Sequence, residues 1–245
     1  MTEFVRQDLS GAWFDDTSLS GARFRNVDLS GVVIRGAIVQ DVEISGEVVS
    51  LRVNGVDVAG YVEAQLDERY PERTRMRPDD ADGFRAAWDV IEVLWSETVE
   101  RYRALPPEKL HERVDGEWSF VENLRHLVFA TDAWVKRAVL GEPSPYSPLD
   151  LPHDEMGDVQ GVPCDREARP SLDEVLALRA DRMRTVRDLL EEMTDERLAG
   201  MTEPVTEPGY PRSESFPVAE CLRIVLNEEF MHRLYVERNL ASLVR

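Results

Sequence analysis

The fold of the C-terminal part of this chain is decided by nine consecutive residues, Asn227-Glu228-Glu229-Phe230-Met231-His232-Arg233-Leu234-Tyr235. At 100° per residue, Glu228 falls on the apolar stripe of an amphipathic helix that follows Pro217, and His232 lies one turn further along, about 6 Å up the axis. A carboxylate among apolar groups is costly unless it is paired, protonated or bound to a cation. Glu and His at i, i+4 can both reach one ion, although such a pair taken alone is more often solvated.

Three further amphipathic segments precede this helix. Apolar residues recur at helical spacing from Phe84 to Tyr102, before Pro106-Pro107 ends the pattern. Two capping-box patterns then start helices, Ser119-x-x-Glu122 and Ser171-x-x-Glu174. Four amphipathic helices of about 20 residues each predict a four-helix bundle.

We therefore expect three parts in the chain: a repeat domain in residues 1–60, a connector in 61–80 and the helical bundle in 81–245. Residues 141–170 are rich in proline and too long for a tight helix hairpin. This stretch predicts a crossover loop within the bundle.

The first fifty residues have a period of five. Every fifth residue is apolar without exception, namely Phe4, Leu9, Phe14, Leu19, Phe24, Leu29, Ile34, Val39, Ile44 and Val49. Five is neither the period of a helix nor that of a strand. Turn-tolerant residues follow the apolar centres, as in Leu9-Ser10-Gly11. A coil that turns a corner every five residues would point these centres inward, and an irregular β meander is the alternative.

This period resembles the pentapeptide-repeat family, whose fold is a four-sided right-handed β-helix. Ten centres at four per coil give about two and a half coils, and such stacks need capped ends. The expected fold class is therefore α+β, with a short right-handed quadrilateral β-helix followed by an all-α bundle. The repeat holds no His and no Cys, so we expect it to serve packing or assembly, for example in a homodimer, and not catalysis.

The amino-acid composition argues against several classes of binding partner. The 29 basic and 48 acidic residues give a net charge of −19, which argues against nucleic acid as the main partner. No apolar run approaches the roughly 20 residues of a membrane span, and the first residues do not read as an export signal. Two widely separated cysteines, Cys164 and Cys221, cannot build a disulfide framework. We expect a cytoplasmic protein that acts on a small-molecule substrate.

Two segments of the bundle resemble the DinB/YfiT-like superfamily. The fourth helix of that superfamily is similar to the stretch quoted first, and the second helix is similar to Gly116-Glu117-Trp118-Ser119-Phe120-Val121-Glu122-Asn123-Leu124-Arg125-His126-Leu127. The likeness covers about residues 80–243. It implies a four-helix bundle with a long second crossover. It also implies a divalent metal bound by one His on the second helix and a pair at i, i+4 on the fourth.

Many members of that superfamily have His at both positions of the pair, whereas this chain has Glu at the first. The departure resembles the His/Glu/His zinc site of the mycothiol-dependent isomerase branch. The resemblance therefore assigns the metal-ligand roles to His126, Glu228 and His232. Zinc is the first expectation, and Ni(II), Fe(II) or Mn(II) also suit such nitrogen and oxygen donors.

Two neutral imidazoles and one carboxylate leave a divalent ion with a residual charge of about +1 and an open position, the pattern of catalytic zinc. A thiol arriving there would be deprotonated. The leading expectation is a metal-dependent enzyme that activates a small thiol such as mycothiol or bacillithiol, for transfer to an electrophile or for thiol-assisted isomerisation. Two alternatives stay open: a non-catalytic, metal-stabilised interaction or oligomerisation module, and a metal-dependent hydrolase.

Four residues near these motifs have secondary expectations. Glu229 is expected to be solvated or to support the site, and His153, in the crossover loop, could cover the metal. Trp118 and Tyr235 are expected to serve packing, and Trp118 could also wall a pocket because it precedes the second helix.

Overall fold

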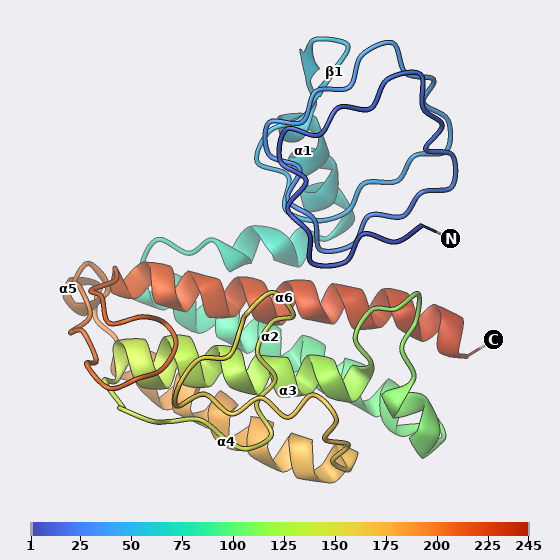
Figure 1. The fold of residues 1–245 in the computed structure, drawn as a ribbon. Helices are drawn as coiled ribbons and strands as arrows, with labels where there is room; N and C mark the ends of the chain where they lie inside the picture. The colour runs from blue at the N-terminus through green and yellow to red at the C-terminus, as the bar shows by residue number, and fades with distance from the viewer. Residues whose placement is uncertain (1, 245) are drawn as a thin grey trace. The chain divides into compact units, whose positions relative to one another are not determined.

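The structure is a computed structural model that describes residues 2–244 (Figure 1). The chain divides into two compact units, Met1–Ile44 and Ser45–Arg245. The first holds most of the repeat, and the second holds the helices. Among the described residues, no helix has the length and apolarity needed to cross a membrane.

The repeat segment is a coil whose backbone turns at every fifth residue (Figure 1). One residue per repeat, two positions after each apolar centre, has a positive φ: Arg6, Gly11, Asp16, Gly21, Asn26, Gly31, Gly36, Asp41 and Gly46. Glycine enters this region without steric cost, and Asn and Asp enter it more easily than other residues do. The period of five in the sequence is thus a period of the backbone.

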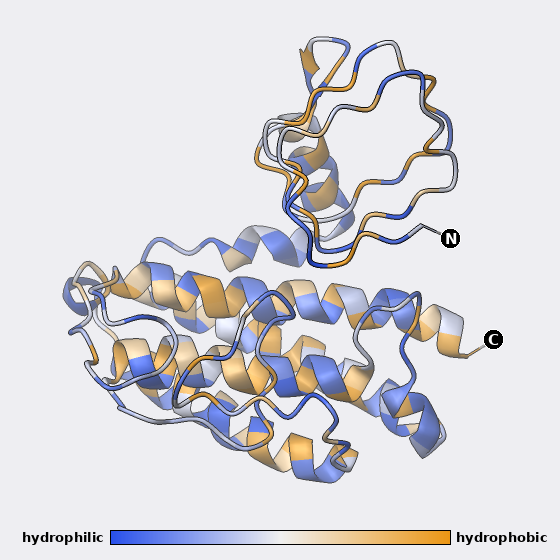
Figure 2. Cartoon of the chain, in the orientation of Figure 1, coloured by the Kyte–Doolittle hydropathy of each residue, from blue (hydrophilic) through white to orange (hydrophobic). Residues whose placement is uncertain are grey.

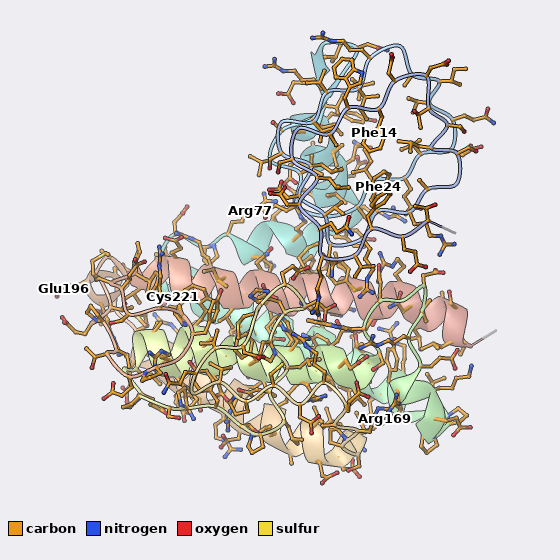
Figure 3. The ribbon with its side chains drawn as sticks, in the orientation of Figure 1. Phe14, Phe24, Arg77, Arg169, Glu196 and Cys221 are labelled. Atoms are coloured by element: carbon orange, nitrogen blue, oxygen red, sulfur yellow. The ribbon has the colours of Figure 1, made fainter. Side chains whose placement is uncertain are left out.

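The right-handed β-helix expected in residues 1–60 is not present in the described part of that segment. Residues 2–50 contain no strand, and the two-stranded sheet of β1 (Arg52–Val53) and β2 (Val56–Asp57) follows them. The apolar centres are not buried either: Phe14 is 57% exposed and Phe24 63% exposed (Figure 3).

The reason for this difference is the shortness of the stack. Backbone hydrogen bonds within residues 2–50 are short-range turn bonds, as from the Ala12 N–H to the Leu9 carbonyl at 2.9 Å. No ladder joins one described coil to the next. About two and a half coils leave most centres without a covered face, so stacking does not bury them.

Four long helices build the second unit and lie side by side (Figure 1). They are α2 (Ala81–Arg103), α3 (Phe120–Thr131), α4 (Leu172–Glu191) and α6 (Val218–Leu243). The π-helix η3 (Asp132–Val139) continues α3. Both α2 and α3 pack against α4 and α6. The four-helix bundle predicted from the sequence is therefore confirmed.

The predicted capping boxes start two of these helices. The Ser119 hydroxyl accepts the Glu122 N–H while the Glu122 carboxylate accepts the Ser119 N–H, and Ser171 and Glu174 repeat the arrangement on α4. Apolar residues from each helix then meet in one core that includes Trp88, Leu124 and Leu226. Figure 2 shows hydrophobic and hydrophilic residues along each long helix.

Shorter elements connect the long helices. They are α1 (Ala59–Arg69), η1 (Pro71–Met76), η2 (Pro107–His111) and α5 (Asp195–Leu198). The segment expected as a connector, 61–80, therefore contains most of α1 and all of η1. Because α1 buries no residue, its contact with η1 is polar: Glu63 and Asp67 bind Arg73 at 2.7 and 2.6 Å.

Candidate metal centre

Three side chains that are far apart in the sequence converge between α3 and α6. Glu228 Oε2 lies 3.3 Å from His126 Nε2 and 3.1 Å from His232 Nε2. One ligand atom from each residue fits within 4.8 Å of the other two. The packing of α3 on α6 brings His126 to the pair, and the i, i+4 spacing places Glu228 and His232 on one face of α6. The structure therefore brings together the three residues that the sequence singled out.

The outer nitrogen of each imidazole has an acceptor. His126 Nδ1 lies 2.8 Å from the Leu151 carbonyl oxygen, and His232 Nδ1 lies 2.7 Å from Asn123 Oδ1. A carbonyl oxygen cannot donate, so both Nδ1 atoms must carry the proton. In the neutral rings, both Nε2 atoms then present a lone pair to Glu228. Metal-binding histidines are commonly held in this way.

The Asn123 side chain has only one orientation that satisfies its surroundings. Its Nδ2 donates to the Trp118 and Ser119 carbonyl oxygens at 3.0 and 2.9 Å. Its Oδ1 must therefore face His232, which fixes the tautomer of that ring. Sequence reasoning did not single out Asn123, although it lies three residues before His126 and so on nearly the same side of α3.

The charges of the cluster favour a cation at its centre. Burial raises the pKa of Glu228, and the two histidines lower it by more only where their Nε2 atoms also carry protons. A direct hydrogen bond from His232 Nε2 would need a doubly protonated, cationic ring. Burial lowers the pKa of His232 and disfavours that form. Three electron-rich atoms thus face one another, and a metal ion can take the place of the missing protons.

Aromatic side chains wall the cluster. The Trp118 ring lies 4.8 Å from the His126 ring and 5.9 Å from the His232 ring, centroid to centroid. Tyr235 meets His232 edge-on at 5.6 Å. Trp118 therefore walls the site, as the sequence allowed. The side chain of Glu228 is 31% exposed, so a small molecule can approach the centre at this carboxylate.

Hydrogen bonds from α3 and from Trp118 hold the crossover loop beside the cluster. Besides the Leu151 carbonyl on His126, Trp118 Nε1 donates to Asp154 Oδ1 at 3.3 Å. Arg125 is fully buried and donates to the carbonyl oxygens of Leu149, Asp165 and Ala168. His153 lies in the same loop, between the hydrogen-bonded residues Leu151 and Asp154. It does not join the cluster, and its ring packs edge-on against Tyr210 at 5.9 Å.

Glu229 differs from the expectation of a solvated side chain. It is 1% exposed, and its carboxylate forms a two-pronged ion pair with Arg179 of α4 at 2.9 and 2.8 Å. The Arg179 guanidinium also lies 5.1 Å from the Trp95 ring. Being about 100° round the helix from Glu228, Glu229 faces α4, where it anchors the ligand-bearing helix.

A buried carboxyl pair lies where the crossover loop meets the bundle. Asp132 binds Arg182 through both oxygens, at 2.8 and 2.9 Å. Asp150 is fully buried, and its ionised oxygens have no donor within reach among the described residues. Burial and the neighbouring Asp132 charge raise the pKa of Asp150 to about 8. Asp150 is therefore protonated at neutral pH.

This pair makes stability depend on pH. Because the pKa of Asp150 is higher in the folded than in the unfolded chain, the native state binds the extra proton, and stability falls as pH rises from about 4 to 8. Asp150→Asn removes that loss, which is on the order of a few kcal/mol. The melting temperature of wild type should fall more steeply than that of D150N between pH 5 and 8.5.

The control for this prediction is Asp158→Asn, an exposed carboxylate of the same loop. It should follow the wild-type curve. Parallel curves for wild type and D150N would contradict the assignment.

Comparison with known proteins gives two matches to family models. A model of the DinB superfamily matches residues 91–236, which include the whole cluster and the crossover loop. A model of pentapeptide repeats matches residues 3–41 in eight copies. Searches of curated proteins and of solved structures found no match.

Proposed function

Because the chain belongs to the DinB superfamily, we propose that it binds one divalent metal ion through His126, Glu228 and His232 and activates a small thiol there. The thiol, of the mycothiol type, would be transferred to an electrophile or assist an isomerisation. The observation that carries the proposal is the pair of Nδ1 hydrogen bonds, which turn both Nε2 lone pairs toward the Glu228 carboxylate.

The donor set suits a reactive ion. Two neutral imidazoles and one carboxylate leave a residual charge of about +1, and three protein ligands leave room for one more. Zinc fits this set best, and Ni(II), Fe(II) or Mn(II) fit the same donors. When bound, the ion would lower the pKa of a thiol enough to supply a thiolate at neutral pH.

Other residues of the chain orient the metal ligands, shield the site from water and leave an entrance to it. The Leu151 carbonyl and Asn123 orient the imidazoles. Trp118 covers both rings and keeps water from that side. The partial exposure of Glu228 leaves an entrance for the thiol. An entrance of this kind favours an enzyme over a purely structural metal site, whose coordination is closed.

The metal ligands can be tested by metal content. Full-length protein prepared without a His tag should hold one equivalent of divalent metal. His126→Ala and His232→Ala should each weaken zinc binding by at least ~100-fold, because loss of a hydrogen-bond partner of a metal-binding histidine alone costs about 10- to 100-fold. The measurement is competition with a chromophoric chelator.

His111→Ala is the matched control, because His111 lies outside the cluster. It should bind metal like wild type. Equal zinc affinity in all four proteins would refute the assigned ligands.

The orientation of His232 can be tested through Asn123. Asn123→Ala removes the acceptor for Nδ1 and should weaken zinc binding about 10- to 100-fold. Asn123→Asp keeps an acceptor for Nδ1 but turns its second oxygen toward the Trp118 and Ser119 carbonyl oxygens, so it should recover only part of the affinity. Loss of affinity in N123D to the level of N123A would argue against the hydrogen bond as the cause.

The reaction class can be tested with two assays on one zinc-loaded sample. Mycothiol or bacillithiol should react with monochlorobimane in a metal-dependent way, and E228Q should lose most of this rate. Hydrolysis of p-nitrophenyl acetate without thiol should stay near the background rate. Fast metal-dependent hydrolysis with no thiol consumption would support a hydrolase instead.

A further inference from the structure

Two tyrosines beside the metal cluster pack through their rings and leave their hydroxyls unpaired in the described part of the chain. Tyr235 lies on α6, seven residues after Glu228 and on the same face. Tyr210 lies in the connection between α5 and α6. Both rings are half-buried, no hydrogen bond of either hydroxyl is seen in residues 2–244, and neither oxygen is among the fully buried atoms that lack a partner. Both hydroxyls are thus free to bind a ligand that reaches the site.

Both tyrosine rings lie beside residues of the cluster or beside a residue that packs on it. Apart from burial, the negative charge of Glu228 raises the pKa of Tyr210 and of Tyr235. The Tyr210 ring stacks on Phe129 at 5.7 Å, and Phe129 lies 6.0 Å from the His126 ring. The Tyr235 ring meets His232 at 5.6 Å. The two tyrosines thus border the cluster on the sides of different ligands.

The position of Tyr210 is strongly held. The Tyr146 hydroxyl donates to the Tyr210 carbonyl at 2.5 Å and accepts the Tyr210 N–H at 2.8 Å. Fully buried Arg137 donates to the carbonyls of the same connection at Val205, Glu207 and Pro211.

The neighbouring Gly209 confirms how closely this connection is held. A Cβ on Gly209 would come within 2.8 to 2.9 Å of the Arg137 and Tyr146 side chains, so a larger residue here would have to displace them. Such fixing is costly in conformational entropy, and it leaves a free hydroxyl beside the site.

We infer that Tyr210 and Tyr235 are hydrogen-bond donors to an oxygen of the bound ligand, so that the site takes a molecule with a carbonyl or carboxylate oxygen beside its metal-binding atom. The inference rests on the proposed function, because it needs an ion at the cluster. It adds a substrate class: a thiol or electrophile with an oxygen acceptor one or two bonds from the reactive atom. The ion holds one atom and the hydroxyls hold the other, which fixes the orientation of the ligand.

Two thiols of the same chain length, one ending in a carboxylate and the other in a hydroxyl, provide the test. Mercaptoacetate and 2-mercaptoethanol both offer a sulfur, and only mercaptoacetate offers a carboxylate. In full-length protein loaded with Co(II), sulfur binding gives a charge-transfer band that reports each Kd. Wild type should prefer mercaptoacetate at least ~10-fold. Tyr210→Phe and Tyr235→Phe should each weaken mercaptoacetate binding about 10-fold and change 2-mercaptoethanol binding less than twofold.

Tyr61→Phe is the matched control, because Tyr61 is an exposed residue of α1, and it should behave like wild type. Cobalt content and melting temperature are measured for every variant, so that a folding defect is seen directly. Unchanged mercaptoacetate affinity in Y210F and Y235F overturns the inference, and so does equal weakening of both thiols. If wild type binds no cobalt, or full cobalt without a thiol band, the proposed function itself fails, and this outcome is distinct from the other two.

Discussion

The structure of the bundle depends on how three electron-rich groups can be held together away from bulk water. Two imidazole lone pairs and one carboxylate lie within 4.8 Å of one another, and their mutual repulsion has to be offset by positive charge. The rings cannot easily supply it, because their Nδ1 protons are already engaged and burial lowers the pKa of His232. The imidazole rings and the helix that carries Glu228 and His232 are instead fixed by neighbouring groups. Asn123 and the Leu151 carbonyl orient the rings, and the Glu229–Arg179 ion pair holds the helix.

Buried arginines link this centre to the connecting segments. Arg125 and Arg137 each bind several backbone carbonyls, and Arg179 and Arg182 bind carboxylates on other helices. A guanidinium has five donors in a fixed plane, which a lysine ammonium cannot match. Of the 29 basic residues, 27 are arginine, and these four give some of that excess a structural use. Long loops without regular hydrogen bonds can thus be fixed around the three-residue cluster.

Much of the fold and of the metal cluster could be predicted from the sequence. The predictions that did not hold have identifiable physical reasons. The helices follow from local signals, because the capping boxes at Ser119 and Ser171 and the apolar periodicity are read within one turn. The cluster followed from the i, i+4 pair, with His126 supplied by family resemblance. The sequence left the role of Glu229 open between a solvated and a supporting side chain, because its partner Arg179 lies 50 residues away. Tyr210 gave no signal, since it lies in an aperiodic connection. The β-helix is not shown in the described residues, because burial of the centres depends on coils stacking, which a period of five does not guarantee.

Each repeat turns at one residue with a positive φ, which we call its corner. These corners limit how the repeat segment can change in length. Every corner is placed two positions after an apolar centre and is filled mostly by glycine, aspartate or asparagine. Gain or loss of whole blocks of five residues leaves each remaining corner in phase with its neighbours. Insertion of one or two residues moves bulky side chains into conformations that they rarely adopt. Natural variation in this part of the gene should therefore occur in steps of fifteen nucleotides.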